Sequence, residues 1–142
     1  MTIQTREVTY ESAGVTFNST MAWDDSLGPR PAVLVAPTWA GCTDFERDQA
    51  LRLAGLGYVG LAVDMYGGGA IVADKAACTA LMTPMMSDRA ILYACIGSAA
   101  DSVPSQPDAA DEPVAALGFC FGCLCGLDLA RSRQDVAGEC SP

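Results

Sequence analysis

Hydrophobic and polar residues alternate in two segments near the start of the chain. Residues 3–10 and 15–22 are rich in β-branched and aromatic side chains, and the short segment "ESAG" separates them. A period of two is typical of strands that bury one face, and a short connection ending in glycine favours an antiparallel hairpin. We therefore expect the fold to open with two antiparallel strands.

Continuous apolar runs then replace the alternation. Residues 32–36, 58–63 and 114–118 contain no charged side chain, and each run is bounded by glycine, proline or an acidic residue. Runs of this length and composition are typical of parallel strands that are buried on both faces. The segment "DVAGECSP" would begin a fourth strand of this kind.

The segments between these runs have the apolar spacing of helices. Thr43 and Glu46 have the spacing of a capping box, and apolar residues then recur at helical intervals until Gly55. Residues 74–103 are predicted to be helical in two pieces. We expect the break at Pro84, because proline lacks the N–H of a helix interior but fits the first turn of a new helix.

Alternating strands and helices predict an α/β layered sheet, mostly parallel after an N-terminal antiparallel hairpin. With 142 residues, 51% of them hydrophobic and 18% charged, the chain is expected to form one globular domain over residues 1–142. The net charge of −9 and the absence of any Lys/Arg cluster argue against nucleic acid and anionic lipid as partners.

No apolar run is long enough to predict a membrane span, and residues 1–10 lack the pattern of a secretory signal. We therefore expect a soluble, cytoplasmic protein. The seven cysteines are odd in number, which argues against a disulfide framework. The absence of histidine disfavours zinc, and the glycines at 67–69 lack the lysine of a phosphate-binding loop, so we expect neither a metal nor a cofactor.

The segment "GFCFG", residues 118–122, has the G-x-C-x-G form of a nucleophile elbow. It lies between the predicted strand at 114–118 and a helix predicted for "FGCLCGLDLARS", residues 121–132. In such a turn the nucleophile has a strained backbone, and glycines two positions away on either side let the strand and the helix approach closely. The positive end of the helix favours a thiolate. Cys120 is therefore the candidate nucleophile, and a buried structural cysteine is the alternative.

In their order and spacing, these motifs resemble the dienelactone hydrolase family of α/β hydrolases, represented here by its amino-terminal portion. The likeness extends over roughly residues 5–139, and its most specific parts are "LAVDMYG" and "GFCFG". The resemblance implies that Cys120 attacks a small-molecule carboxylic ester or lactone. It also implies that the backbone N–H groups of Trp39 and Phe121 form the oxyanion hole.

The chain also departs from the family pattern. Family members carry the triad Asp and His after the elbow, whereas this sequence has no histidine and no residue that matches the acid. Thr38 stands where dienelactone hydrolases have a glutamate that helps control the thiol, and Cys123 stands at a position that is usually glycine. Loss of the base slows acyl transfer by orders of magnitude and leaves a residual enhancement of ~10³–10⁴ over water. We therefore expect impaired activity from this chain alone.

Two other functions stay open. In the first, the chain is a truncated, catalytically inactive product that binds or self-assembles. Without the final strands of the family, residues 114–118 would form an exposed apolar edge, which invites pairing with a second copy. Alternatively, Cys120-x-x-Cys123 opens a helix as dithiol redox sites do, although the order of elements matches a hydrolase. Asp44, Glu46 and Asp48 are expected to act as capping and dipole partners of the helix that starts there. The family resemblance implies that Asp64 is structural.

Overall fold

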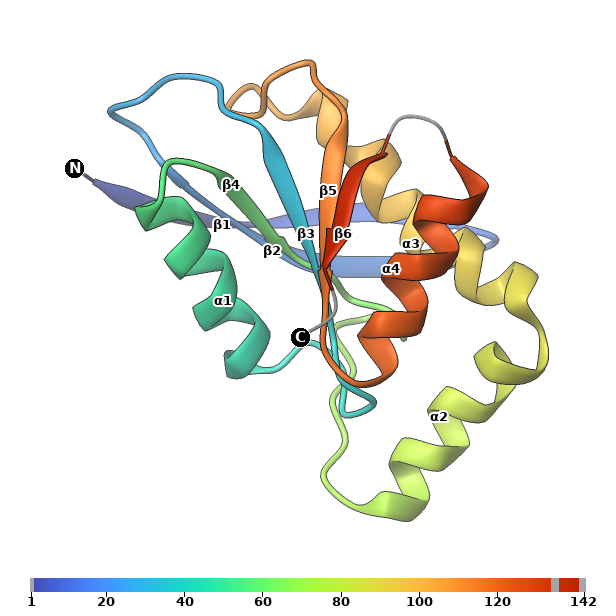
Figure 1. Ribbon diagram of the computed structural model, residues 1–142. Coiled ribbons are helices and arrows are strands. Elements are labelled where there is room, and N and C mark those ends of the chain that lie inside the picture. Colours follow the sequence, from blue (N-terminus) through green and yellow to red (C-terminus); the bar gives the residue numbers. More distant parts are fainter. Residues whose placement is uncertain (1, 134–135, 141–142) are drawn as a thin grey trace.

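A computed structural model of the chain describes residues 2–133 and 136–140 (Figure 1). Its six strands form one sheet in the order β1-β2-β4-β3-β5-β6. The strands are β1 (Ile3–Ser12), β2 (Val15–Asp24), β3 (Ala32–Ala36), β4 (Val59–Ala62), β5 (Val114–Gly118) and β6 (Val136–Cys140). β1 and β2 form an antiparallel hairpin, β2 is antiparallel to β4, and the other pairs are parallel. The expected sheet, mostly parallel after an antiparallel hairpin, is confirmed.

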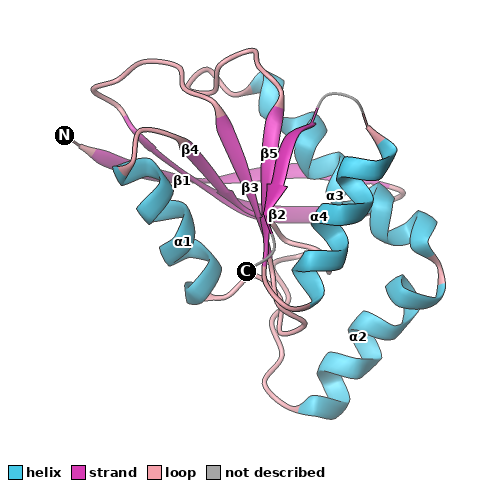
Figure 2. Cartoon of the chain, in the orientation of Figure 1, coloured by secondary structure: helices cyan, strands magenta, loops and turns pink. Residues whose placement is uncertain are grey.

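Helices cover both faces of the sheet, as Figure 2 shows in cyan. They are α1 (Asp44–Gly55), α2 (Lys75–Ser87), α3 (Arg89–Ser102), the short 3₁₀ helix η1 (Val103–Ser105) and α4 (Phe121–Ser132). α1 packs on β2 and β4 on one face, whereas α3 and α4 lie on the other, with α4 against β5 and β6. Among the described residues, no helix combines the length and apolar character needed to cross a bilayer.

The core lies between the sheet and the pair α3 and α4. Leu34 and Leu61 of the central strands are fully buried there, together with Leu92, Ile96 and Leu129 of the helices. On the other face, α1 approaches the sheet so closely that a Cβ on Gly60 would lie 2.6 Å from the Ala50 Cα. The small residues of this interface explain how one short helix packs tightly on β4.

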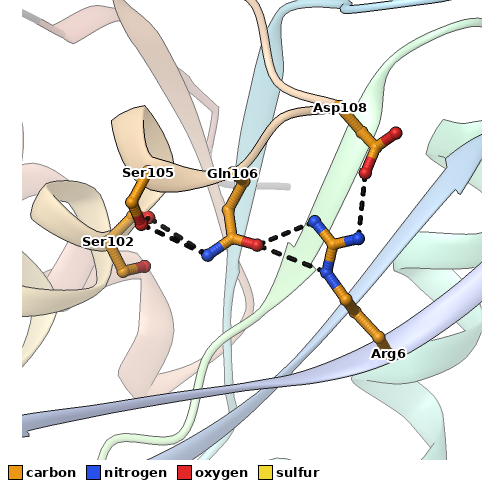
Figure 3. Close-up of polar contacts among 5 residues, drawn as sticks. All are labelled: Arg6, Ser102, Ser105, Gln106 and Asp108. Carbon is orange, nitrogen blue, oxygen red and sulfur yellow. Dashed lines mark hydrogen bonds and ion pairs between the residues drawn. The ribbon is translucent and has the colours of Figure 1, made fainter.

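A polar network ties β1 to the loop before β5 (Figure 3). The Arg6 guanidinium donates to the Asp108 carboxylate at 2.9 Å and to the Gln106 side-chain oxygen at 2.8 Å, and it lies 4.6 Å from the centre of the Trp23 ring. The Gln106 amide donates in turn to the Ser105 hydroxyl at 3.4 Å. These contacts join residues about a hundred positions apart and fix β1 to the loop that precedes β5.

Two expectations are wrong, one about a helix boundary and one about which strand lies at the edge of the sheet. α2 continues through Pro84, which is exposed near the helix end, and the break falls at Asp88. Asp88 is extended, and its carboxylate caps α3 by accepting a hydrogen bond from the Ala90 N–H at 3.1 Å. The Asp88 carboxylate caps α3, which favours a helix start at this position, whereas α2 tolerates Pro84 in its last turn despite the lost hydrogen bond and the steric conflict of the ring. The second error concerns β5, which is not an edge strand, because β6 pairs with it in parallel.

Candidate active site

Cys120 occupies a sharp turn between β5 and α4. Its backbone has φ 57° and ψ −117°, and only one other described non-glycine residue, Ala13, has a positive φ. Such a conformation costs about 1–3 kcal/mol and persists only where the surrounding structure imposes it. The Cys120 side chain is exposed, so the strained turn presents a thiol to solvent at the carboxyl edge of the parallel strands.

The glycines on either side of Cys120 allow this turn. A Cβ on Gly118 would overlap the Gly122 carbonyl group. A Cβ on Gly122 would overlap the Ala36 carbonyl and lie 2.7 Å from the Pro37 carbonyl oxygen. Both positions therefore require glycine because backbone meets backbone there, and the first turn of α4 lies directly against the end of β3.

The loop after β3 brings Trp39 to the same edge of the sheet. The Thr38 carbonyl accepts from the Gly41 N–H at 3.2 Å, and the Thr38 hydroxyl accepts from the Ala40 N–H at 3.3 Å. Within the described residues, the N–H groups of Trp39 and Phe121 have no protein acceptor. Two backbone donors are thus available at the end of the sheet that carries Cys120.

Tyr66, which the sequence reasoning missed, links these two segments. Its hydroxyl donates to the Trp39 carbonyl oxygen at 2.7 Å, and its ring stacks on Phe121 with centroids 6.2 Å apart and an interplanar angle of 11°. Burial raises the pKa of Tyr66 well above its usual value, so the phenol keeps its proton at neutral pH. The sequence offered one signal for Tyr66, its position just after the β4 segment. Because parallel strands end at a common edge of the sheet, a residue at this position is expected to lie at the same edge as Cys120.

Asp64 organises the loop that carries Tyr66. Its buried carboxylate accepts four backbone N–H bonds, from Asn18 at 3.0 Å, Tyr66 at 3.1 Å, Gly67 at 3.0 Å and Gly69 at 2.8 Å. Both oxygens are fully engaged with the backbone. Asp64 is therefore structural, as its position suggested, and does not offer an acid or base to Cys120.

The acidic residues at the start of α1 are also engaged locally. Glu46 is buried, and its Oε1 accepts both the N–H and the hydroxyl of Thr43 at 2.8 Å. Asp44 pairs with Arg47 at 3.2 Å. Beside them, Phe45 packs edge-to-face on Phe119, with ring centroids 4.9 Å apart. Phe119 directly precedes Cys120 in the chain, so this aromatic pair lies next to the elbow.

The remaining described cysteines differ from Cys120 in exposure. Cys42, Cys78, Cys95 and Cys125 are buried, and burial raises the pKa of Cys42 to about 12 and that of Cys95 to about 11. Cys123 is half-buried, and its thiol donates to the Gly118 carbonyl at 3.3 Å. All cysteines whose side chains are described are free thiols, and in that part of the chain no three His, Cys, Asp or Glu residues converge on a common point.

Two hollows in the surface lie away from the elbow. One, of about 280 Å³, is apolar and lies between the hairpin tip at Ala13 and the start of α3 at Ile91. The other, of about 240 Å³, lies beside the loop at Asp111. Cys120 lines neither hollow, so the strained turn, rather than cavity volume, identifies the candidate site.

Comparisons with known proteins agree with this geometry. A family model described as the dienelactone hydrolase family matches residues 17–141. A solved structure called m3DLH is 35% identical with a TM-score of 0.93, covering 98% of this chain and 58% of that chain. The dienelactone hydrolase-like promiscuous phosphotriesterase P91 from metagenomic libraries is 33% identical with a TM-score of 0.94, covering 99% and 59%.

A dienelactone hydrolase from Anabaena variabilis shares the fold at 18% identity, with a TM-score of 0.75, covering 98% of this chain and 62% of that chain. The chain therefore spans less than two thirds of the length of each of these three structures. No curated protein matches the chain.

Proposed function

The chain belongs to the dienelactone hydrolase family, and we propose that residues 1–142, as one domain, carry the nucleophile and the oxyanion hole of a carboxylic ester or lactone hydrolase. The observation that carries this proposal is the exposed thiol of Cys120 at φ 57°, at the start of α4. A cysteine held in this conformation between a buried strand and a helix is suited to attack a carbonyl group from solvent.

In the proposed reaction, the Cys120 thiolate attacks the carbonyl carbon of the ester. The carbonyl oxygen becomes an oxyanion, which accepts hydrogen bonds from the N–H groups of Trp39 and Phe121. Collapse of this intermediate breaks the C–O bond, the leaving alkoxide takes a proton from water, and Cys120 is left as a thioester. Preorganised donors of this kind lower such a barrier by about 3–4 kcal/mol each.

The proposed reaction also needs a general base to activate the thiol. The 142 residues contain no histidine, and the buried carboxylate of Asp64 is engaged by backbone donors. Activation of the thiol then depends on the start of α4, whose dipole favours the thiolate. Attack of water on the thioester has no such help, so we propose that acylation is faster than deacylation and that the thioester accumulates.

The substrate class follows from the family and from the surroundings of Cys120. The Phe45 and Phe119 rings supply an apolar wall for the acyl or alcohol group of a small ester. P91, at 33% identity, is described as a promiscuous phosphotriesterase. An activated phosphotriester is therefore a reasonable second electrophile to test on Cys120.

Self-association is the competing, non-catalytic proposal. In the described part of the chain β1 and β6 are the two outer strands of the sheet, and β6 lies next to β5. An outer strand is a template for pairing with a strand of another chain. We propose that two copies pair through β6. Light scattering over a range of protein concentrations tests this, and a monomer at every concentration would contradict it.

Intact-mass spectrometry after exposure to p-nitrophenyl acetate tests the hydrolase proposal. The wild-type protein should gain one acetyl group that persists for longer than it takes to form. Cys120→Ala should lose this adduct, whereas the matched variant Cys123→Ala should keep it. Equal acetylation of Cys120→Ala would refute the nucleophile. A reversible Cys120–Cys123 disulfide at a defined potential, without acetylation, would favour the redox alternative.

A further inference from the structure

The side chain of Tyr66 contacts two segments that are far apart in the sequence. Its hydroxyl reaches the carbonyl of Trp39, and its ring lies parallel to that of Phe121. The N–H groups of Trp39 and Phe121 lack a protein acceptor in the described structure, and we propose them as the oxyanion donors. One side chain therefore touches both halves of the proposed oxyanion hole.

The hydrogen bond to Trp39 acts on a peptide group that is held at both ends. The Trp39 carbonyl and the Ala40 N–H belong to the same planar peptide. Tyr66 donates to the carbonyl at 2.7 Å, and the Thr38 hydroxyl accepts from the N–H at 3.3 Å. Only the two backbone torsions of Trp39 separate this peptide from the Trp39 N–H, so fixing the peptide restricts the direction of that donor.

The contact with Phe121 acts on the other donor. Phe121 is the first residue of α4, and its side chain is buried. The stacked Tyr66 ring closes one side of the space that the Phe121 ring occupies. Because the ring is attached to the residue whose N–H is the second donor, packing that holds the ring also limits rocking of the helix start.

Tyr66 is itself held in place. Its backbone N–H donates to the buried carboxylate of Asp64 at 3.1 Å, and the next N–H, of Gly67, donates to the same oxygen at 3.0 Å. A carboxylate anchored by four backbone donors is a rigid base for the loop. The Tyr66 side chain therefore connects the loop that Asp64 anchors to both proposed donors, Trp39 and Phe121.

We propose that Tyr66 is a positioning residue that sets the directions of both backbone donors of the oxyanion hole. The inference rests on the proposed function, since it assigns a purpose to a contact between proposed donors. Tyr66 does not touch the reacting atoms in this proposal. It acts through Trp39 and Phe121.

The test compares two reactions of the same thiol. Acylation of Cys120 by p-nitrophenyl acetate passes through an oxyanion, whereas alkylation by iodoacetamide displaces iodide from a saturated carbon and forms none. Tyr66→Phe keeps the ring and removes the hydroxyl. Removing an oxyanion donor outright costs about 10²–10³ in rate, and loss of positioning alone should cost less, so we expect acylation to slow by about tenfold and alkylation to stay within about twofold.

Two further variants keep the outcome interpretable. Thr38→Val removes the second bond to the same peptide and should show the same selective loss of acylation. Tyr58→Phe is the matched control, because Tyr58 is 42% exposed and its hydroxyl has no acceptor in the described residues. It should leave both rates unchanged.

Equal rates for Tyr66→Phe and the wild type would overturn the inference, and so would an equal loss in both reactions, which would make Tyr66 a purely structural residue. If Tyr66→Phe fails to fold, the same readings of Thr38→Val decide the question. Absence of acylation at Cys120 in the wild type would instead refute the proposed function itself, and the two failures are therefore distinguishable.

Discussion

Gly122, in the first turn of α4, lies in direct contact with the carbonyl group of Ala36 at the end of β3. The contact explains how the turn at Cys120 tolerates its positive φ. β3 and β5 are neighbours in the sheet, and α4 can start against both only because backbone meets backbone. The strained conformation is therefore imposed by packing around it, rather than by any hydrogen bond of the cysteine side chain.

Replacement of Gly122 by alanine should push α4 away from β3. The added Cβ would lie 2.7 Å from the Pro37 carbonyl oxygen, and the atoms in the way belong to the backbone. We expect a loss of about 1–3 kcal/mol in the free energy of unfolding, which is typical of overpacking, measured by urea denaturation. Gly55→Ala is the control, because a Cβ there meets open space. Identical midpoints for the two variants would contradict the close packing.

Thiol labelling of the folded protein at pH 7.5 should select Cys120. Cys42 and Cys95 are buried, and their pKa values are raised to about 12 and about 11, so near neutral pH they are both protonated and shielded. Raising the pH to 9 should not make Cys42 and Cys95 react with the label, whereas unfolding the protein in urea should. Peptide mapping after iodoacetamide treatment measures this, and rapid labelling of Cys42 in the native state would show that α1 does not cover it.

Asp64→Asn should destabilise the loop at the carboxyl end of β4. Four backbone N–H groups point at the two carboxylate oxygens, and an amide replaces one oxygen by a group that donates. We expect a loss of about 1.5–3 kcal/mol, the range for hydrogen bonds to a charged group, from urea denaturation. Asp74→Asn is the control, since Asp74 caps α2 and asparagine caps equally well. A stable Asp64→Asn protein would refute the anchoring role.

Asp128 should make stability depend on pH in the acid range. The Arg89 guanidinium donates to its two oxygens at 2.7 and 2.6 Å, and these bonds hold the pKa of Asp128 below its ordinary value. A folded-state pKa below the unfolded one, about 3.9, stabilises the fold above that pH. The stabilisation is lost as the pH falls through the folded-state pKa.

The comparison with Asp128→Asn isolates this contribution. The wild type should exceed the variant in free energy of unfolding near pH 7, and the difference should shrink below about pH 4. A constant difference between wild type and Asp128→Asn from pH 7 to pH 3 would contradict the prediction.

Local patterns in the sequence were sufficient for most of the framework. The alternation in residues 3–10 and 15–22, the apolar runs and the Thr43–Glu46 capping box each depend on neighbours within a few positions, and all of them appear in the structure. The turn at Cys120 was also predictable, because its glycines are two residues away. The prediction of a helix break at Pro84 was wrong, because the break falls at Asp88, where the aspartate caps α3.

What only the tertiary structure decided is which distant residues meet. Trp39, Tyr66 and Phe121 follow three different strands, and nothing in their local sequence specifies a 2.7 Å hydrogen bond or a stacked pair of rings. Such contacts depend on the order and register of parallel strands and on close packing at their common edge. The sequence by itself therefore determined the elements and the nucleophile candidate, whereas the fold decided the surroundings of that nucleophile, because strand neighbours are chosen by long-range packing.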